Sequence, residues 1–144
     1  MIGIIVMGHG HFASGLASSL HFIAGTVENV FFVDFEIEQS ANDLRENLHR
    51  AMEGLSDCDG ILILCDLAGG SPFVNAVEWK YECIEQKTEV IAGVNFPMLI
   101  EAVSKMTLYD DPLELAEVVV STGKECIARF EMKRHEDDTE INGI

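Results

Sequence analysis

Four short apolar runs, each followed by a segment with helical periodicity, constrain the fold of this chain more than any other feature. The runs occupy residues 2–7, 30–35, 60–65 and 89–94. Runs of this length that are apolar almost throughout are typical of strands covered on both faces. Because parallel strands need crossover helices between them, the alternation predicts an α/β fold with an open, mostly parallel, doubly wound sheet and helices on both faces.

The segments between the apolar runs carry helix start signals. Ser40 followed by Asp43 has the spacing of a capping box, and leucines at helical intervals extend this second helix to about residue 55. Pro72, Pro97 and Pro112 each have the position of a residue in the first turn of a further helix.

The end of the chain changes its pattern. Apolar and polar residues alternate over 124–132, which predicts a fifth strand. Residues 133–144 are polar, and we expect them to form a mobile tail. A chain of 144 residues without an internal linker has room for one domain, which we place at residues 1–132.

Composition excludes several classes of function. The chain has 9 Lys and Arg against 25 Asp and Glu, a formal net charge of −16. Such a chain is repelled by nucleic acid and by anionic lipid, so we expect no nucleic-acid partner. No apolar run approaches the ~18–20 residues of a membrane span, and the N-terminus lacks the features of a secretory signal. We therefore expect a cytoplasmic protein that does not insert into a membrane.

Polar residues follow the apolar runs, where the carboxyl ends of parallel strands share one rim of a sheet. His9 lies between two glycines after the first run, Asp34 lies near the end of the second, and Asp66 follows the third. Ligands of open α/β sheets bind beyond this rim. The sequence therefore predicts a functional site that includes His9 and Asp66.

The residue types at the predicted site suit a reactive histidine beside a phosphate-binding loop. An exposed imidazole such as that of His9 can act as nucleophile, general base or metal ligand. Asp66 could fix the tautomer of that ring by accepting a hydrogen bond from one nitrogen. Gly69, Gly70 and Ser71, with Ser71 as the predicted N-cap, place amide groups at a helix N-terminus, which favours phosphate binding. The plainer alternatives are a loop histidine without chemistry and an aspartate that caps the loop amides.

The same residues are also compatible with two other classes of function. The spacing of His9 and His11, taken with Asp66, occurs at metal sites of barrel hydrolases, although such a barrel needs ~200–250 residues. A non-catalytic flavodoxin-like binding module would leave the rim histidine inert. The four cysteines show no CxxC spacing, so neither a disulfide framework nor a zinc–cysteine site is predicted.

Four motifs in this order resemble a known family. They are GHGHFASGL at 8–16, VDF at 33–35, ILCDLAGGSPF at 63–73 and EVIAGVNFPML at 89–99. Together they resemble the IIA domain of the mannose/fructose/sorbose class of the bacterial sugar phosphotransferase system. The resemblance spans most of residues 1–130.

The resemblance implies a phosphotransferase without metal or cofactor. His9 would accept a phosphoryl group from the phosphocarrier protein HPr and pass it to a IIB component, with membrane-associated IIC and IID components downstream. Asp66 would orient His9, and Gly69, Gly70 and Ser71 would cradle the phosphoryl oxygens. A related alternative is the phosphohistidine subunit that feeds dihydroxyacetone kinase, which would share the chemistry of His9 and differ in the recipient.

The resemblance also implies how the chain assembles. Members of the family form homodimers in which the last strand, here 124–132, crosses to the partner's sheet. Some members continue into a IIB domain, whereas this sequence stops at Ile144 and is expected to act as a separate IIA component. We expect HPr to dock over the rim, on an apolar patch around Phe12, Pro72 and Phe73.

Overall fold

Strands and helices alternate along the chain, as the apolar runs predict. The computed structural model describes residues 1–134. Its elements are β1 (Ile2–His9), α1 (Phe12–Ala24), β2 (Val30–Phe35), α2 (Ala41–Gly54), β3 (Gly60–Cys65), α3 (Ser71–Glu82), β4 (Thr88–Ala92), α4 (Phe96–Lys105) and α5 (Pro112–Glu125).

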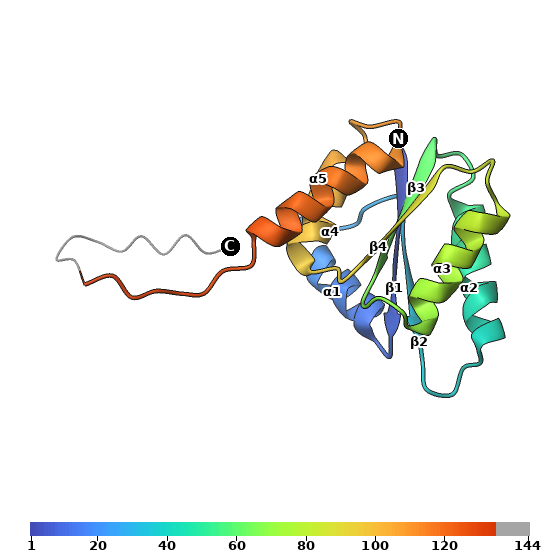
Figure 1. Ribbon diagram of the computed structural model, residues 1–144, viewed down its shortest axis with the longest axis horizontal. Helices are drawn as coiled ribbons and strands as arrows, with labels where there is room; N and C mark the ends of the chain where they lie inside the picture. The colour runs from blue at the N-terminus through green and yellow to red at the C-terminus, as the bar shows by residue number, and fades with distance from the viewer. Residues whose placement is uncertain (135–144) are drawn as a thin grey trace.

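The four strands form one sheet in the order β2-β1-β3-β4, and every neighbouring pair is parallel. Helices α1, α4 and α5 cover one face and helices α2 and α3 cover the other (Figure 1). The predicted open, doubly wound parallel sheet is confirmed. Strands β2 and β4 lie at the two edges, and the site expected at the carboxyl ends is centred on β1 and β3.

The central strand β1 is buried on both faces, which explains its continuous apolar run. Ile4 and Val6 belong to the core shared with α1, α4 and α5. Ile5 and Met7 belong to the core shared with α2 and α3. Each of these side chains is fully buried, and burying one aliphatic side chain contributes about 1.5–3 kcal/mol. Two such cores hold β1 firmly, so the residues that follow it start from a fixed point.

Helix starts agree with the sequence signals, with one exception. Ser40 and Asp43 form the predicted capping box at the start of α2. For α3, the N-cap is Gly70, whose backbone is extended, and Ser71 is already the first helical residue. The prediction of Ser71 as N-cap is therefore wrong by one position.

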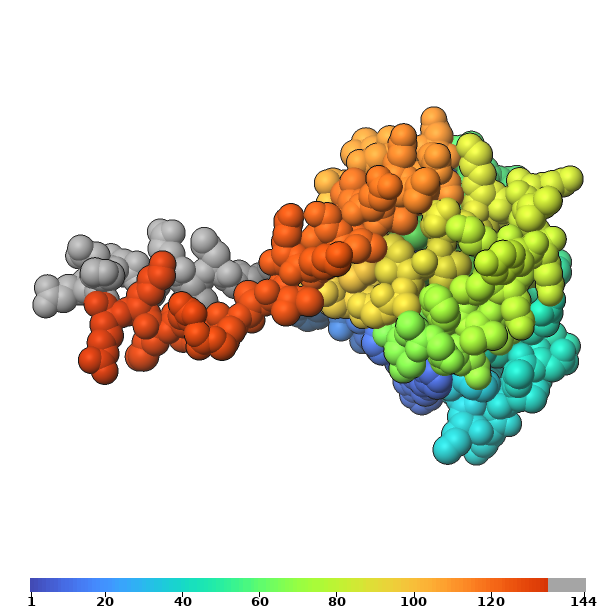
Figure 2. All heavy atoms as spheres, in the orientation of Figure 1, coloured from blue at the N-terminus to red at the C-terminus, as the bar shows by residue number. Residues whose placement is uncertain are grey.

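The predicted strand over 124–132 is not formed within this chain. Helix α5 continues through Glu125, and residues 127–134 have no regular secondary structure and are exposed. This segment leaves the body of the molecule, shown in red in Figure 2. A strand is stabilised by hydrogen bonds to a neighbouring strand, and residues 127–134 have no such neighbour within this chain. Of the predicted tail, only residues 133 and 134 belong to the described part of the chain.

No helix in the described part of the chain is long and apolar enough to cross a membrane.

Candidate functional site

The carboxyl ends of β1 and β3 bring His9 and Asp66 together. Cys65 pairs with Met7 in the parallel register, and the amide of Asp66 donates to the carbonyl of Met7 at 3.1 Å. Asp66 therefore begins its loop directly beside the end of β1. This placement was predicted from the apolar runs, because parallel neighbours end at the same edge of the sheet.

The Asp66 carboxylate holds His9 by two hydrogen bonds. Its Oδ2 accepts from the His9 backbone amide at 2.9 Å and lies 2.7 Å from the His9 Nδ1. Its Oδ1 accepts from the Leu67 amide at 2.9 Å. The side chain of Asp66 is only 10% exposed, whereas that of His9 is 44% exposed. The ring is thus anchored at one nitrogen and open to solvent elsewhere.

The charge state of Asp66 determines the tautomer of His9. Burial by itself raises the pKa of Asp66, but the hydrogen bonds from the His9 amide, the His9 ring and the Leu67 amide outweigh it, so the pKa lies below its ordinary value. An ionised carboxylate only accepts hydrogen bonds. The His9 Nδ1 must therefore donate, which leaves the lone pair of Nε2 free in the neutral ring.

The loop before α3 lies against the free side of the His9 ring. A Cβ atom added to Gly70 would lie 2.6 Å from the His9 Cε1 and 3.2 Å from Nε2. Gly69 has a φ of 80°, a conformation that favours glycine, and Gly70 and Ser71 lead into α3. The first amides of a helix have no intrahelical partner and attract anions. A phosphoryl group on Nε2 would meet these amides.

On the expectation that His9 is the phosphoryl acceptor, substituting Gly70 by alanine should slow phosphoryl uptake about 10- to 100-fold, because small misplacements of reacting groups have effects of this size. The Gly70 φ of −78° suits alanine, so the added methyl group acts only by displacing the ring. The rate of phosphoryl transfer from HPr measures this. Gly15→Ala is the matched control, since a Cβ there meets nothing within 4 Å. A Gly70→Ala chain as fast as wild type would show that the contact is irrelevant.

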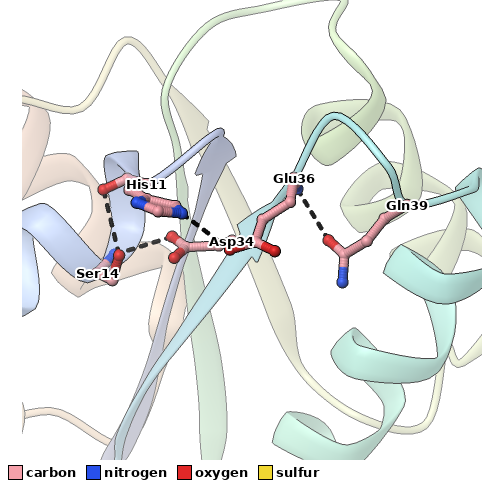
Figure 3. A network of polar contacts seen from close by, with 5 residues as sticks. All are labelled: His11, Ser14, Asp34, Glu36 and Gln39. Atoms are coloured by element: carbon pink, nitrogen blue, oxygen red, sulfur yellow. Dashed lines mark hydrogen bonds and ion pairs between the residues drawn. The ribbon is translucent and has the colours of Figure 1, made fainter.

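His11 takes part in a different cluster from His9. Its Nε2 lies 2.8 Å from the Glu36 Oε1, and the Asp34 carboxylate is close by (Figure 3). Within residues 1–134, His11, Asp34 and Glu36 are the only group of three His, Cys, Asp or Glu residues whose potential ligand atoms lie within 4.8 Å of one another. The combination of His9, His11 and Asp66 expected for a hydrolase is not assembled.

Two neighbours of the site were not predicted from the sequence. Phe35 packs beside His9 with ring centroids 6.1 Å apart, and Glu36 reaches His11. The sequence pattern that could have predicted both neighbours is the end of the second apolar run, where Phe35 lies between Asp34 and Glu36. Asp34 and Phe35 end β2 and Glu36 follows it, and the alternation places the phenyl ring on the side opposite to the Asp34 carboxylate.

The predicted docking patch is smaller than expected. Pro72 is buried, while Phe12 and Phe73 are half-buried. Pro72 is the second residue of α3 and contributes little to the exposed surface. Leu67, in the loop that follows Asp66, is 50% exposed and supplies apolar surface instead.

Residues 3–119 match the family of PTS system fructose IIA components. The chain belongs to this family. The resemblance to IIA components of the mannose/fructose/sorbose class is therefore confirmed.

Individual relatives agree with this membership. The IIA chain is 37% identical over 134 residues to the "PTS system mannose-specific EIIAB component" of Escherichia coli (strain K12), covering 92% of this chain but 40% of that protein. It is 34% identical over 104 residues to the "PTS system fructose-specific EIIA component" of Bacillus subtilis (strain 168), covering 72% of this chain and 70% of that protein. The chain thus spans less than half of the mannose-specific relatives it matches.

Solved structures share the fold of this IIA component. The crystal structure of phosphotransferase system component EIIA from Streptococcus agalactiae superposes with a TM-score of 0.83 and is 37% identical, covering 90% of this chain and 97% of that one. The mannose/sorbose-specific IIA subunit from Enterococcus faecalis superposes with a TM-score of 0.80 at 23% identity, covering 92% and 97%. The second likeness supports the fold alone.

Proposed function

We propose that this IIA component is a phosphohistidine carrier of a bacterial sugar phosphotransferase system. His9 accepts a phosphoryl group from phospho-HPr and passes it to a IIB component, from which membrane IIC and IID components use it for sugar uptake. The observation that supports this most is the arrangement of the His9 ring. Asp66 binds Nδ1, and Nε2 lies beside the amides that begin α3.

The transfer to His9 needs no proton to move to or from the ring. The lone pair of Nε2 attacks phosphorus, and the bond between phosphorus and the donor's nitrogen breaks with its electron pair returning to the donor. The new bond places positive charge on the imidazole, and the Asp66 carboxylate stabilises that charge through Nδ1. Catalysis consists mainly of positioning and of neutralising charge.

The loop of Gly69, Gly70 and Ser71 has the complementary role. Its amides and the positive end of the α3 dipole would bind the phosphoryl oxygens as His9 becomes loaded. The onward step to IIB reverses the first step, so the loop must not bind phosphohistidine much more tightly than the transition state. An open rim and a small number of amide donors meet this requirement.

A two-stage transfer assay tests the proposal. Incubation with phosphoenolpyruvate, enzyme I and HPr should add one acid-labile phosphoryl group per chain, seen by intact mass. Adding a IIB component of the mannose/fructose/sorbose class should then remove it. Retention by IIB together with discharge by dihydroxyacetone kinase would favour the alternative recipient. No uptake from active phospho-HPr would refute the proposed function.

We also propose that the chain is a homodimer in which residues 127–132, the part of the predicted strand that follows α5, pair with the partner's sheet. Ile127, Phe130 and Met132 are 76%, 76% and 84% exposed, which is costly for apolar side chains in an unpaired segment. Strand β4 has an open edge, and a groove beside it is lined by Val90 and Val120. Such an edge accepts an added strand.

Charge in the exposed segment should weaken this dimer. Phe130→Asp is expected to shift the chain toward monomer in analytical ultracentrifugation, because it places a charge in the apolar interface. Phe22→Asp is the control, since Phe22 is 92% exposed on α1. A wild-type chain that sediments as a monomer, or a Phe130→Asp chain that stays dimeric, would contradict strand exchange.

A further inference from the structure

A cluster of one imidazole and two carboxylates lies at the ends of β1 and β2, apart from the His9 and Asp66 pair. The potential ligand atoms of His11, Asp34 and Glu36 all lie within 4.8 Å of one another. We propose that these three residues bind a single divalent transition-metal ion of the zinc class. This site is not needed for the phosphoryl transfer proposed above, and nothing in that mechanism uses it.

The backbone holds the three ligand-bearing residues in place. Asp34 lies in β2 and Glu36 follows its last residue, and their carboxylate oxygens lie within 4.8 Å of one another. The Gly10 amide donates to the Phe35 carbonyl at 2.7 Å, which fixes the end of β1 against the end of β2 just before His11. Asp34 therefore lies in the sheet, while His11 and Glu36 closely follow the ends of two paired strands.

Local hydrogen bonds orient the ligands further. The Asp34 Oδ1 accepts from the Ser14 amide at 2.9 Å, so Asp34 is tied to the first turn of α1 (Figure 3). The Glu36 amide donates to the Gln39 side chain at 2.8 Å. Outer contacts of this kind orient metal ligands and improve affinity. His11 is the N-cap of α1, yet its side chain makes no capping bond and instead turns toward Glu36.

Charge and donor type favour a transition-metal ion. Two carboxylates held this close repel each other, in a chain whose net charge is already −16. One divalent cation balances both charges. An imidazole nitrogen with two carboxylate oxygens suits Zn²⁺ and similar ions, whereas Mg²⁺ prefers oxygen donors and retains its waters. On binding, the His11 Nε2 lone pair coordinates the ion, and a proton on that nitrogen leaves to solvent.

The site is open to solvent, so an ion can enter and keep a free coordination position. The side chains of His11 and Glu36 are 74% and 53% exposed. Asp34 and Glu36 also line a surface hollow of about 410 Å³. Three protein ligands with an accessible fourth position are typical of zinc sites that bind water or another ligand, and not of closed structural sites.

Isothermal titration calorimetry of the untagged full chain with Zn²⁺ tests this inference. Wild type should bind one ion per chain at this site. His11→Ala and the nearly isosteric Glu36→Gln should each lower that affinity about tenfold or more. Circular dichroism checks that both variants fold. Wild-type affinity in a folded His11→Ala or Glu36→Gln chain would overturn the inference.

Control variants separate this site from other ligands. A chain carrying both Cys126→Ser and His21→Ala should bind Zn²⁺ as wild type does, since neither residue belongs to the cluster. His9→Ala should also retain binding, which distinguishes the site from one that uses the proposed phosphoryl acceptor. Loss of binding in either control, absence of Zn²⁺ binding in wild type, or equal affinity for Mg²⁺ would refute the proposal.

Discussion

We expect phosphoryl uptake from phospho-HPr to be abolished in the His9→Ala chain and to persist in the His11→Ala chain. This result is expected because, of these two histidines, only His9 has its Nδ1 bound by a carboxylate and its Nε2 beside the α3 amides. The ring of His11 is directed at Glu36 instead. Intact mass after incubation with phosphoenolpyruvate, enzyme I and HPr measures both variants in one experiment.

His11 is a well-matched control for His9, since the two histidines are separated by one glycine and both are exposed. A His9→Ala chain that folds and still gains a phosphoryl group would place the acceptor elsewhere. Loss of uptake in both variants would instead indicate that the β1–α1 connection as a whole had been disturbed. Circular dichroism of each variant separates that outcome from a chemical one.

Asp66→Asn should slow phosphoryl uptake by about 100-fold or more, an effect comparable to losing the residue that fixes a catalytic histidine tautomer. Asparagine offers one acceptor and one donor group where Asp66 offers two acceptors to His9 and Leu67. The ring then loses its tautomer preference and its counter-charge. Rapid-quench measurement of uptake compares the two chains, and an unchanged rate would remove Asp66 from the mechanism.

The same substitution should change the pH dependence of stability. The pKa of Asp66 is lower in the folded chain than its ordinary value, so its stabilising effect is complete above the unfolded value of ~3.9 and is lost as the pH falls through the folded value. Asp66→Asn should therefore cost about 1–3 kcal/mol of unfolding free energy near pH ~6 and less near pH ~3. Urea unfolding at both values measures this, and an equal cost at both would contradict the lowered pKa.

The sheet and the His9 and Asp66 pair could be predicted because both depend on local sequence. Fully buried runs such as Ile61 to Cys65 require cover on both faces, and parallel strands end at one edge. That edge must then carry His9 and Asp66. Close approach of the loop also follows from sequence, since Gly70 leaves space for the ring.

Other features depend on information that local patterns do not contain. The alternation over 124–132 predicts a strand, but α5 continues through Glu125 and residues 127–134 have no strand partner within this chain. The contact between His11 and Glu36 depends on the register of β1 against β2, in which His9 lies opposite Phe35. Periodicity predicts that a strand exists but does not give the residues it faces across the sheet.

The atom that carries the phosphoryl group tests the central claim most directly. Phosphorus NMR correlated with the imidazole ring protons, recorded on the phosphorylated chain, distinguishes phosphate on Nε2 from phosphate on Nδ1. The structure predicts phosphate on the Nε2 of His9, because Asp66 binds Nδ1 and the α3 amides lie beside Nε2. Phosphate on the Nδ1 of His9, or on any other histidine, would contradict this account.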